Sequence, residues 1–91
     1  MEFTNNTDRK RYEVRIDGKL AGFAEYIQMT GLIIFSHTEV LPAFEGQGVG
    51  SKLAKFALDD VRADGTRKVQ PLCPFIQGWI ERHDDYKDLV R

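Results

Sequence analysis

One stretch of the sequence decides the fold: Val40-Leu41-Pro42-Ala43-Phe44-Glu45-Gly46-Gln47-Gly48-Val49-Gly50-Ser51-Lys52-Leu53. It joins an apolar strand to the first turn of an amphipathic helix, and its three glycines stand at alternate positions. Glycine lets the backbone turn tightly and approach a ligand closely. The helix N-terminus beyond it offers unpaired N–H groups and a partial positive charge of roughly half a unit. The stretch therefore predicts either a phosphate or pyrophosphate site or a tight turn that binds nothing.

The residues before this stretch predict antiparallel strands. Apolar and polar residues alternate over residues 12–16, which is the period of a half-buried strand. Asp17-Gly18 is a favoured hairpin turn, residues 20–29 form the return strand, and Thr30-Gly31 marks a second turn. Residues 32–35 are apolar on both faces, as in an interior strand. We expect an antiparallel three-stranded meander.

The residues after it predict a crossover. Apolar residues recur at helical spacing over residues 49–64, and Gly65 is a favoured helix terminator. Residues 66–72 then form a short strand, and Pro74 begins a last helix. Strand, helix and strand in succession imply a right-handed crossover and a parallel pair. The fold class is α/β (α+β): the meander, the crossover and a C-terminal helix.

Length and composition limit the other possibilities. The 91 residues suit one domain over 1–91, with residues 1–8 expected to be flexible. Thirteen Lys and Arg against fourteen Asp and Glu give a net charge of −1, so neither nucleic acid nor an anionic membrane is an expected partner. The chain has a single cysteine and no signal peptide or membrane span, and no group of residues has metal-ligand spacing. We expect a cytoplasmic monomer or weak homodimer without metal.

Two motifs carry a family resemblance. Val40-x-Pro42 leading into Gly46-Gln47-Gly48-Val49-Gly50 and Leu53 resembles the GNAT superfamily of acetyl-CoA-dependent N-acetyltransferases. The C-terminal Pro71-Leu72-Cys73-Pro74-Phe75, with Trp79-Ile80 and His83-x-x-Tyr86, is similar to the minimal single-domain GNAT-like family of the YjdJ type. Glu45 departs from the pattern, since Arg or Gln is usual there, and its carboxylate has to point away from a pyrophosphate.

The resemblance implies a truncated GNAT-like fold that binds acetyl-CoA (coenzyme A) as cosubstrate and transfers its acetyl group to an amine acceptor. The pantetheine arm would lie along Glu39, Val40 and Leu41, with a backbone N–H near Val40 or Leu41 stabilising the thioester oxyanion. The pyrophosphate would lie over Gly46, Gln47, Gly48, Val49, Gly50 and Ser51. The chain has no room for the strand and two helices that usually precede the meander, so we expect an open acceptor side. The acceptor itself, a small molecule or an exposed protein amine, is not identified.

Cys73 and His37 are the candidate catalytic residues. Cys73 precedes Pro74 and is expected at the N-cap of the last helix, whose positive end favours an ionised thiol. In the resembled family this cysteine is the proposed active-site residue; the alternative is a small buried apolar residue. His37 lies near the end of the neighbouring strand and is a candidate base, with Glu39 in reserve on the same strand face. Equally, His37 can be a structural strand-end histidine, and His83 is expected to be structural.

Two other functions remain open at this point. The same glycine-rich stretch can serve a coenzyme A-binding module that acts as a sensor or docking surface without efficient transfer. A purely structural interaction domain is the third interpretation. Binding of acetyl-CoA separates the third from the first two, and turnover of an amine separates the first from the second.

Overall fold

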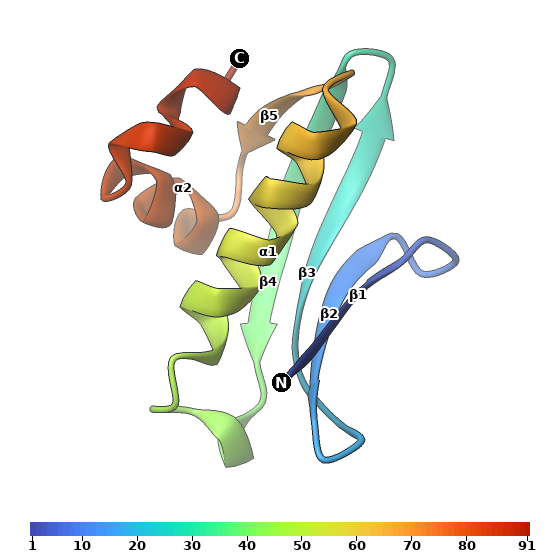
Figure 1. Cartoon of the computed structure of the whole chain (residues 1–91), viewed down its shortest axis with the longest axis vertical. Coiled ribbons are helices and arrows are strands. Elements are labelled where there is room, and N and C mark those ends of the chain that lie inside the picture. Colours follow the sequence, from blue (N-terminus) through green and yellow to red (C-terminus); the bar gives the residue numbers. More distant parts are fainter.

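Alternating apolar residues build one five-stranded sheet in the order β1-β2-β3-β4-β5 (Figure 1). The first four strands are antiparallel to their neighbours, and β4 and β5 are parallel. The computed structural model describes all 91 residues. The strands are β1 (Glu2–Asn6), β2 (Arg11–Ile16), β3 (Lys19–Met29), β4 (Leu32–Val40) and β5 (Lys68–Pro71).

The predicted meander is present, but it has four strands. The turn at Asp17-Gly18 has φ of 51° and 78°, the left-handed pair that a two-residue hairpin requires. The expectation of a flexible N-terminus is wrong for β1, which pairs with β2 from Glu2↔Arg15 to Asn6↔Arg11. Phe3 holds β1 in place, because its ring stacks on Phe56 with centroids 5.2 Å apart. The polar sequence around Phe3 conceals this strand.

Helix α1 (Val49–Asp64) has the predicted bounds and packs against the sheet. Its buried residues follow the helical period: Val49, Gly50, Leu53, Ala54, Ala57, Leu58 and Val61. They meet Val14, Ala24 and Phe35 from three neighbouring strands in one buried cluster. Burial of a side chain such as Leu53 stabilises the fold by about 1.5–3 kcal/mol. This cluster fixes the N-terminus of α1 relative to the end of β4.

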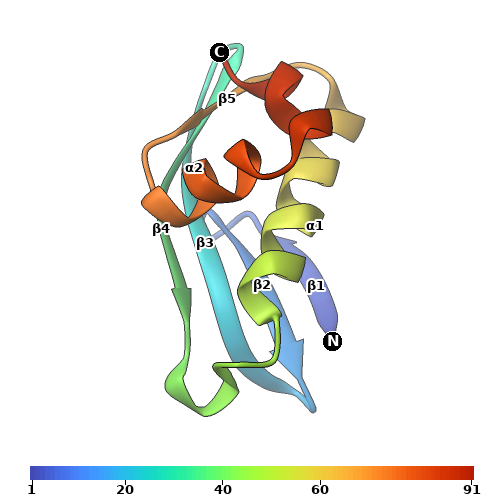
Figure 2. The same cartoon turned by 90° about the vertical axis from the view of Figure 1, so that its left-hand side faces the viewer.

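The C-terminal third packs on the same side of the sheet as α1. Helix α2 (Pro74–Glu81) and the 3-10 helix η2 (Asp84–Leu89) follow β5, and the short 3-10 helix η1 (Pro42–Phe44) precedes α1. Arg62 of α1 binds Asp88 of η2, and Val90 forms a parallel bridge to Val69 at the outer edge of β5. Figure 2 shows α1 and α2 on one side of the sheet, and the other side carries no helix. No helix has the length and apolar character needed to cross a membrane.

A bulge in β4 exchanges the faces of its second half. Glu25 and Tyr26 are consecutive in β3, but their partners in β4 are His37 and Phe35, so Ser36 is the extra residue. Phe35 before the bulge is fully buried under the helices. A regular strand would place His37 on the same face as Phe35. The bulge turns Thr38 toward the helices instead and leaves His37 on the other face.

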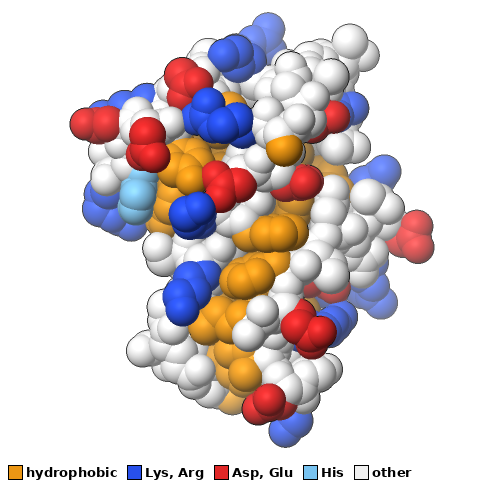
Figure 3. Space-filling model, viewed as in Figure 1, with side chains coloured by type: hydrophobic (Ala, Val, Ile, Leu, Met, Phe, Trp, Pro, Cys, Tyr) orange, Lys and Arg blue, Asp and Glu red, His pale blue; other side chains and the backbone are white.

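Lys, Arg, Asp and Glu side chains are interspersed around a narrow apolar strip on the face that carries the helices (Figure 3). Several of them pair with each other, such as Lys55 with Asp59 at 2.7 Å. Exposed pairs of this kind contribute little to stability, typically about 0.2–1 kcal/mol. The helical face therefore has no charged area of a single sign.

Candidate functional site

The two parallel strands separate at a fork beside the core. β5 pairs with β4 from Leu32↔Lys68 to Phe35↔Pro71, and the pairing ends there. The carbonyl oxygen of Phe35 accepts hydrogen bonds from the N–H groups of both Leu72 (3.1 Å) and Cys73 (3.0 Å). The chain then turns into α2, so residues 37–40 of β4 pair with β3 alone. We call this separation of β4 and β5 at Phe35 the fork.

The glycine loop, residues 46–51, connects η1 to the first turn of α1. Gly46 and Gly48 have φ of 82° and 73°, a region that side chains with a Cβ rarely adopt. A Cβ built on either glycine would meet no atom within 4 Å, so both face open space. α1 has no side-chain N-cap. None of the backbone hydrogen bonds outside the regular elements is donated by residues 46–51. The loop thus presents several N–H groups that have no acceptor in the protein.

Gly50 has a different role from the other two glycines. A Cβ at this position would lie 2.7 Å from the ring of Phe75, closer than real Cβ atoms approach other atoms. Gly50 therefore allows α2 to bring Phe75 directly against the first turn of α1. Trp79 strengthens this contact, since its Nε1–H donates to Ser51 Oγ at 2.9 Å. These two contacts set the position of α2 relative to the glycine loop.

A surface hollow of about 300 Å³ lies over the glycine loop. Six of the predicted coenzyme-binding residues line it: Val40, Gly46, Gly48, Val49, Gly50 and Ser51. Phe44, Glu45, Phe75 and Arg82 complete the lining. Arg82 comes from the end of α2 and has no ion pair with any carboxylate of the chain. The hollow therefore combines free N–H groups with one unpaired cation.

Cys73 lies at the fork, as the N-cap of α2, where the sequence places it. Its side chain is buried, and its Sγ–H donates to the Thr38 hydroxyl at 3.1 Å. The bulge in β4 is the reason for this contact, because it turns Thr38 toward the helices. The thiol is thus held at the end of the gap between the two strands.

His37 and Glu39 lie on the opposite face of the sheet from Cys73. Both are exposed, with His37 Nε2 3.3 Å from Glu39 Oε1, and the His37 ring lies near Phe23 with centroids 6.1 Å apart. The structure does not bring His37 into contact with Cys73. Glu39 likewise points away from the hollow and does not line it. Only its backbone, which borders the gap between β4 and β5, still fits the predicted pantetheine path.

Leu41 and Gln47 are the two other predicted coenzyme-binding residues, and neither lines the hollow. The Leu41 N–H donates to the Ala21 carbonyl at 2.8 Å, so it is already used within the sheet and is not a free oxyanion donor. Of the two predicted donors, the Val40 N–H is the one that remains. Gln47 is exposed at the tip of the glycine loop and does not line the hollow.

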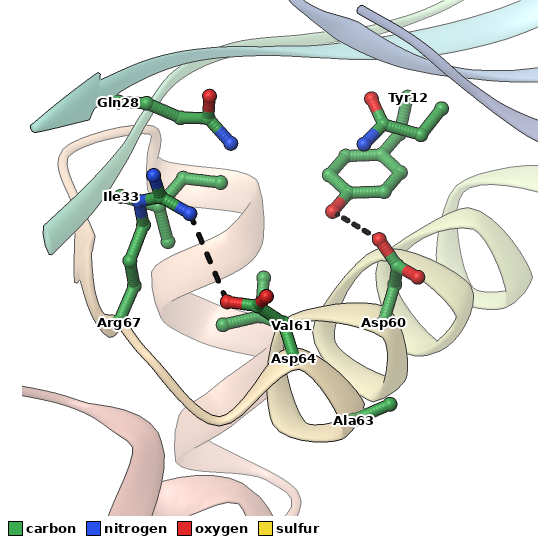
Figure 4. Close-up of a pocket in the computed structure, with 9 residues that line it drawn as sticks. Tyr12, Gln28, Ile33, Asp60, Val61, Ala63, Asp64 and Arg67 are labelled. Atoms are coloured by element: carbon green, nitrogen blue, oxygen red, sulfur yellow. Dashed lines mark hydrogen bonds and ion pairs between the residues drawn. The ribbon is translucent and has the colours of Figure 1, made fainter. Parts of the chain in front are cut away.

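A second hollow, of about 350 Å³, lies at the other end of α1 and contains none of the predicted residues (Figure 4). Its charged groups have partners within the protein. Tyr12 donates to Asp60 at 2.7 Å, and Arg67 lies 3.7 Å from Asp64. Burial, together with the Asp60 carboxylate, raises the pKa of the Tyr12 hydroxyl far above its usual value. The chemistry of this hollow is that of a paired structural network.

The arrangement of fork, glycine loop and crossover agrees with the comparisons to known proteins. The family model described as GCN5-related N-acetyl-transferase matches residues 11–89. The chain belongs to this family. Among solved structures, it is similar to the NMR solution structure of a GCN5-like protein from Staphylococcus aureus, described as a candidate N-acetyltransferase. The TM-score is 0.74 at 24% identity, covering 99% of this chain and 87% of that chain, and this likeness concerns the fold. No curated protein matches the chain.

Proteins of the GCN5-related family use acetyl-CoA, and the residues present fit that group. The orphan N–H groups suit a pyrophosphate, and the open space at Gly46 and Gly48 lets it approach.

Sequence reasoning missed Arg82, Phe75 and Thr38 as site residues. Phe75 stands in the C-terminal motif of the resemblance, but that motif does not indicate its contact with the loop. Arg82 and Phe75 reach the loop from another helix, and Thr38 reaches Cys73 through a bulge, so no local sequence pattern predicts these contacts. No group of three or more His, Cys, Asp or Glu side chains has a metal-binding arrangement.

Proposed function

We propose that this protein is an N-acetyltransferase that binds acetyl-CoA between the glycine loop and the fork and transfers the acetyl group to an amine. The observation that carries the proposal is the set of N–H groups in residues 46–51 without an acceptor, in a chain of the GCN5-related family.

Arg82 and Glu45 act in opposite directions on a bound pyrophosphate. The Arg82 guanidinium lines the hollow, forms no ion pair within the protein and is suited to contact phosphate oxygens. Glu45 lines the same hollow, and its charge repels the phosphates. Because Glu45 is exposed, its side chain is free to turn outward at little cost. Arg82 thus offsets the Glu45 departure from the family pattern.

The fork receives the pantetheine arm and the acetyl group. Residues 37–40 of β4 have no strand partner on the side of β5, so their edge is available to an extended arm. The gap leads to Cys73 and to the backbone of Val40. Acetyl-CoA supplies an acetyl group activated as a thioester. The protein aligns it along β4 and offers the Val40 N–H to the thioester oxygen.

The transfer breaks the C–S bond of the thioester and forms a C–N bond to the amine. The amine loses one proton, and the coenzyme thiolate gains one. A lysine-like amine is almost fully protonated at pH 7, so a base or desolvation is needed. In the proposed reaction His37 or Glu39 accepts that proton from an amine on the side of the sheet that carries no helix. Cys73 either carries the acetyl group or lies beside the coenzyme sulfur, with Thr38 as the positioning residue for its Sγ.

Thermal unfolding in the presence of acetyl-CoA tests the binding step. A hundredfold excess over Kd adds about 2.7 kcal/mol to the stability of the folded state. A chain that shows no shift at millimolar acetyl-CoA contradicts the proposal. Binding without release of coenzyme A in the presence of amines supports the binding-module interpretation instead.

The role of Cys73 is tested by mass spectrometry and turnover together. If the thiol carries the acetyl group, wild type incubated with acetyl-CoA gains one acetyl group on the peptide that contains Cys73, and Cys73→Ala loses turnover. If Cys73→Ala keeps full turnover while Arg82→Gln weakens binding of acetyl-CoA, transfer is direct from coenzyme A to the amine.

A further inference from the structure

A third hollow, of about 520 Å³, lies beside the part of β3 that extends past β2. Pairing of β2 with β3 ends at Arg11↔Glu25, so residues 26–29 of β3 have β4 as their only strand partner. Residues 26–30 line the hollow, and Lys10 and Arg67 complete it from two other segments. It is the largest hollow of the chain, and its volume lies within the range of about 300–1,000 Å³ that is usual for small-molecule sites.

This hollow is separate from the proposed coenzyme site. It shares no lining residue with the hollow over the glycine loop, and Cys73 does not line it. Gln28 and Arg67 line both this hollow and the one that contains Tyr12 and Asp60 (Figure 4), so the two adjoin near the C-terminus of α1. A ligand in the third hollow therefore leaves the glycine loop free.

Both charged side chains that line the third hollow are cations. Lys10 and Arg67 line it, and no Asp or Glu does. Lys10 forms no ion pair within the protein. The charge of the hollow therefore favours an anion.

Arg67 is held in position and still has free hydrogen-bond donors. Its Nε–H donates to the Met29 carbonyl at 3.2 Å, which fixes the guanidinium at the end of β3. The Asp64 carboxylate lies 3.7 Å from Nη1 of Arg67, beyond hydrogen-bond distance, and accepts from the N–H of Thr66 instead. Both terminal nitrogens of Arg67 can therefore donate to a ligand, and a carboxylate matches such a pair of donors.

The same hollow exposes apolar side chains. Ile27 and Met29 line it and are 54% and 55% exposed. Their positions alternate along β3, so both side chains lie on the same face of the strand. A ligand that covers them removes apolar surface from water, which favours binding. The occupant should therefore have an apolar body next to its anionic group.

We propose that the third hollow binds a small organic carboxylate with an apolar body. The carboxylate accepts hydrogen bonds from the terminal nitrogens of Arg67, and the Lys10 ammonium group lies beside it. The apolar body lies on Ile27 and Met29. This inference does not depend on acetyl transfer, because the site and the coenzyme site share no residue.

Three probes test the class of ligand: octanoate, 1-octanol, which lacks the charge, and acetate, which lacks the apolar body. Each is titrated into the protein while the amide chemical shifts are followed by two-dimensional NMR. We expect octanoate to bind with a Kd of about 1 mM and to shift the amides of residues 26–30 most. Binding of 1-octanol and of acetate should be at least about tenfold weaker.

Three variants test the two cations. Arg67→Lys keeps the positive charge but loses the paired donors, and it should weaken octanoate binding about tenfold. Lys10 has a φ of 56°, a region that Asn tolerates, so Lys10→Asn removes the charge without added strain and should weaken binding about threefold to tenfold. Arg9→Gln is the matched control, since it removes a cation from the same turn and Arg9 lines no hollow. It should leave the Kd of octanoate unchanged.

Several outcomes overturn the inference. Equal affinity for octanoate and 1-octanol contradicts an anion site, and tighter binding of octyl phosphate than of octanoate contradicts the carboxylate. Shifts at residues 46–51 in place of residues 26–30 would put the anion at the glycine loop. Shifts at residues 26–30 that depend on protein concentration without ligand would mean that a second copy covers the hollow. Equal losses in Lys10→Asn and Arg9→Gln would reduce the effect to net charge.

Saturating acetyl-CoA separates this inference from the proposed function. The Kd of octanoate should be the same with and without the coenzyme, and mutual displacement would overturn a separate site. A protein that binds octanoate at residues 26–30 but does not bind acetyl-CoA would remove the proposed function and support this inference.

Discussion

The two ends of helix α1 each border a hollow, and the two hollows differ in what their polar groups do. The one at the N-terminus is about 300 Å³ and the one at the C-terminus about 350 Å³. At the N-terminus the N–H groups of residues 46–51 and the Arg82 guanidinium have no partner in the protein. At the C-terminus Tyr12 binds Asp60, and Arg67 lies beside Asp64 (Figure 4). Unpaired polar groups, and not volume, distinguish a ligand site from a surface network.

The glycines at the two ends make the sharpest test of this difference. Gly48 and Gly65 have almost the same backbone, with φ of 73° and 74°. Alanine at either position costs about 1–2 kcal/mol of stability, because a Cβ is strained in the left-handed region. We expect Gly48→Ala to weaken acetyl-CoA binding about tenfold to a hundredfold and Gly65→Ala to leave it unchanged, as measured by calorimetry. Equal losses of affinity would show that strain at a helix end, and not the free N–H groups, controls binding.

Trp79 connects α2 to the N-terminus of α1. Its replacement by phenylalanine separates the contribution of Trp79 to core packing from its contribution to the position of α2. Trp79→Phe removes the hydrogen bond to Ser51 and part of the stacking on His83, whose ring centroid lies 3.7 Å away. We expect a loss of about 1–3 kcal/mol in urea unfolding and a severalfold weaker Kd for acetyl-CoA. The matched variant is Tyr86→Phe, which removes a hydrogen bond of η2 to Asp59 away from the loop. An unchanged Kd in Trp79→Phe would mean that α2 does not set the geometry of the glycine loop.

Tyr12→Phe probes the paired network at the C-terminal end. The variant removes the 2.7 Å hydrogen bond to Asp60 and keeps the ring in the core. We expect a loss of about 0.5–1.5 kcal/mol in unfolding free energy, the ordinary contribution of such a bond. Binding of acetyl-CoA should not change. A loss of acetyl-CoA affinity in Tyr12→Phe would contradict the separation of the two ends.

Asp64 gives the smallest expected effect on stability, and its lowered pKa predicts how that effect depends on pH. Hydrogen bonds from the hydroxyl and the N–H of Thr66, with the nearby charge of Arg67, lower the pKa of Asp64 below its usual value of 3.8. Its stabilisation is therefore complete above about pH 4 and is lost as the pH falls through the lowered pKa. Asp64→Asn should lower the unfolding free energy slightly at pH 7, and the difference from wild type should disappear as the pH falls below the lowered pKa, as measured by a series of urea unfolding curves. Parallel acid limbs in the variant and in wild type would refute this assignment.

Much of the fold follows from local patterns. The alternation in β2, the Asp17-Gly18 turn and the helical period of α1 each depend on neighbours within a few residues, so they are readable along the chain. The same holds for Cys73 as the N-cap of α2, since Pro74 marks the first helical position. β1 was not predicted, because only one apolar residue, Phe3, packs it against the core. A single apolar residue shows no periodicity in the sequence.

The candidate site was readable only in part. The glycine loop was marked by its spacing, because a left-handed backbone requires glycine wherever it occurs. His37 and Cys73 looked like partners from their positions near two neighbouring strand ends. The bulge at Ser36 places them on opposite faces, and nothing in the residues around Ser36 signals it.

By itself the sequence determined the order of the elements from β2 to α2, the glycine loop and the placement of Cys73 at a helix N-terminus. Each of these depends on backbone preferences that act over a few residues. Only the tertiary structure decided that Arg82 and Phe75 border the loop, that Thr38 holds the thiol, and that His37 lies on the opposite face of the sheet from Cys73. These features arise where segments distant in sequence pack together, and the free energy of that packing depends on the whole core.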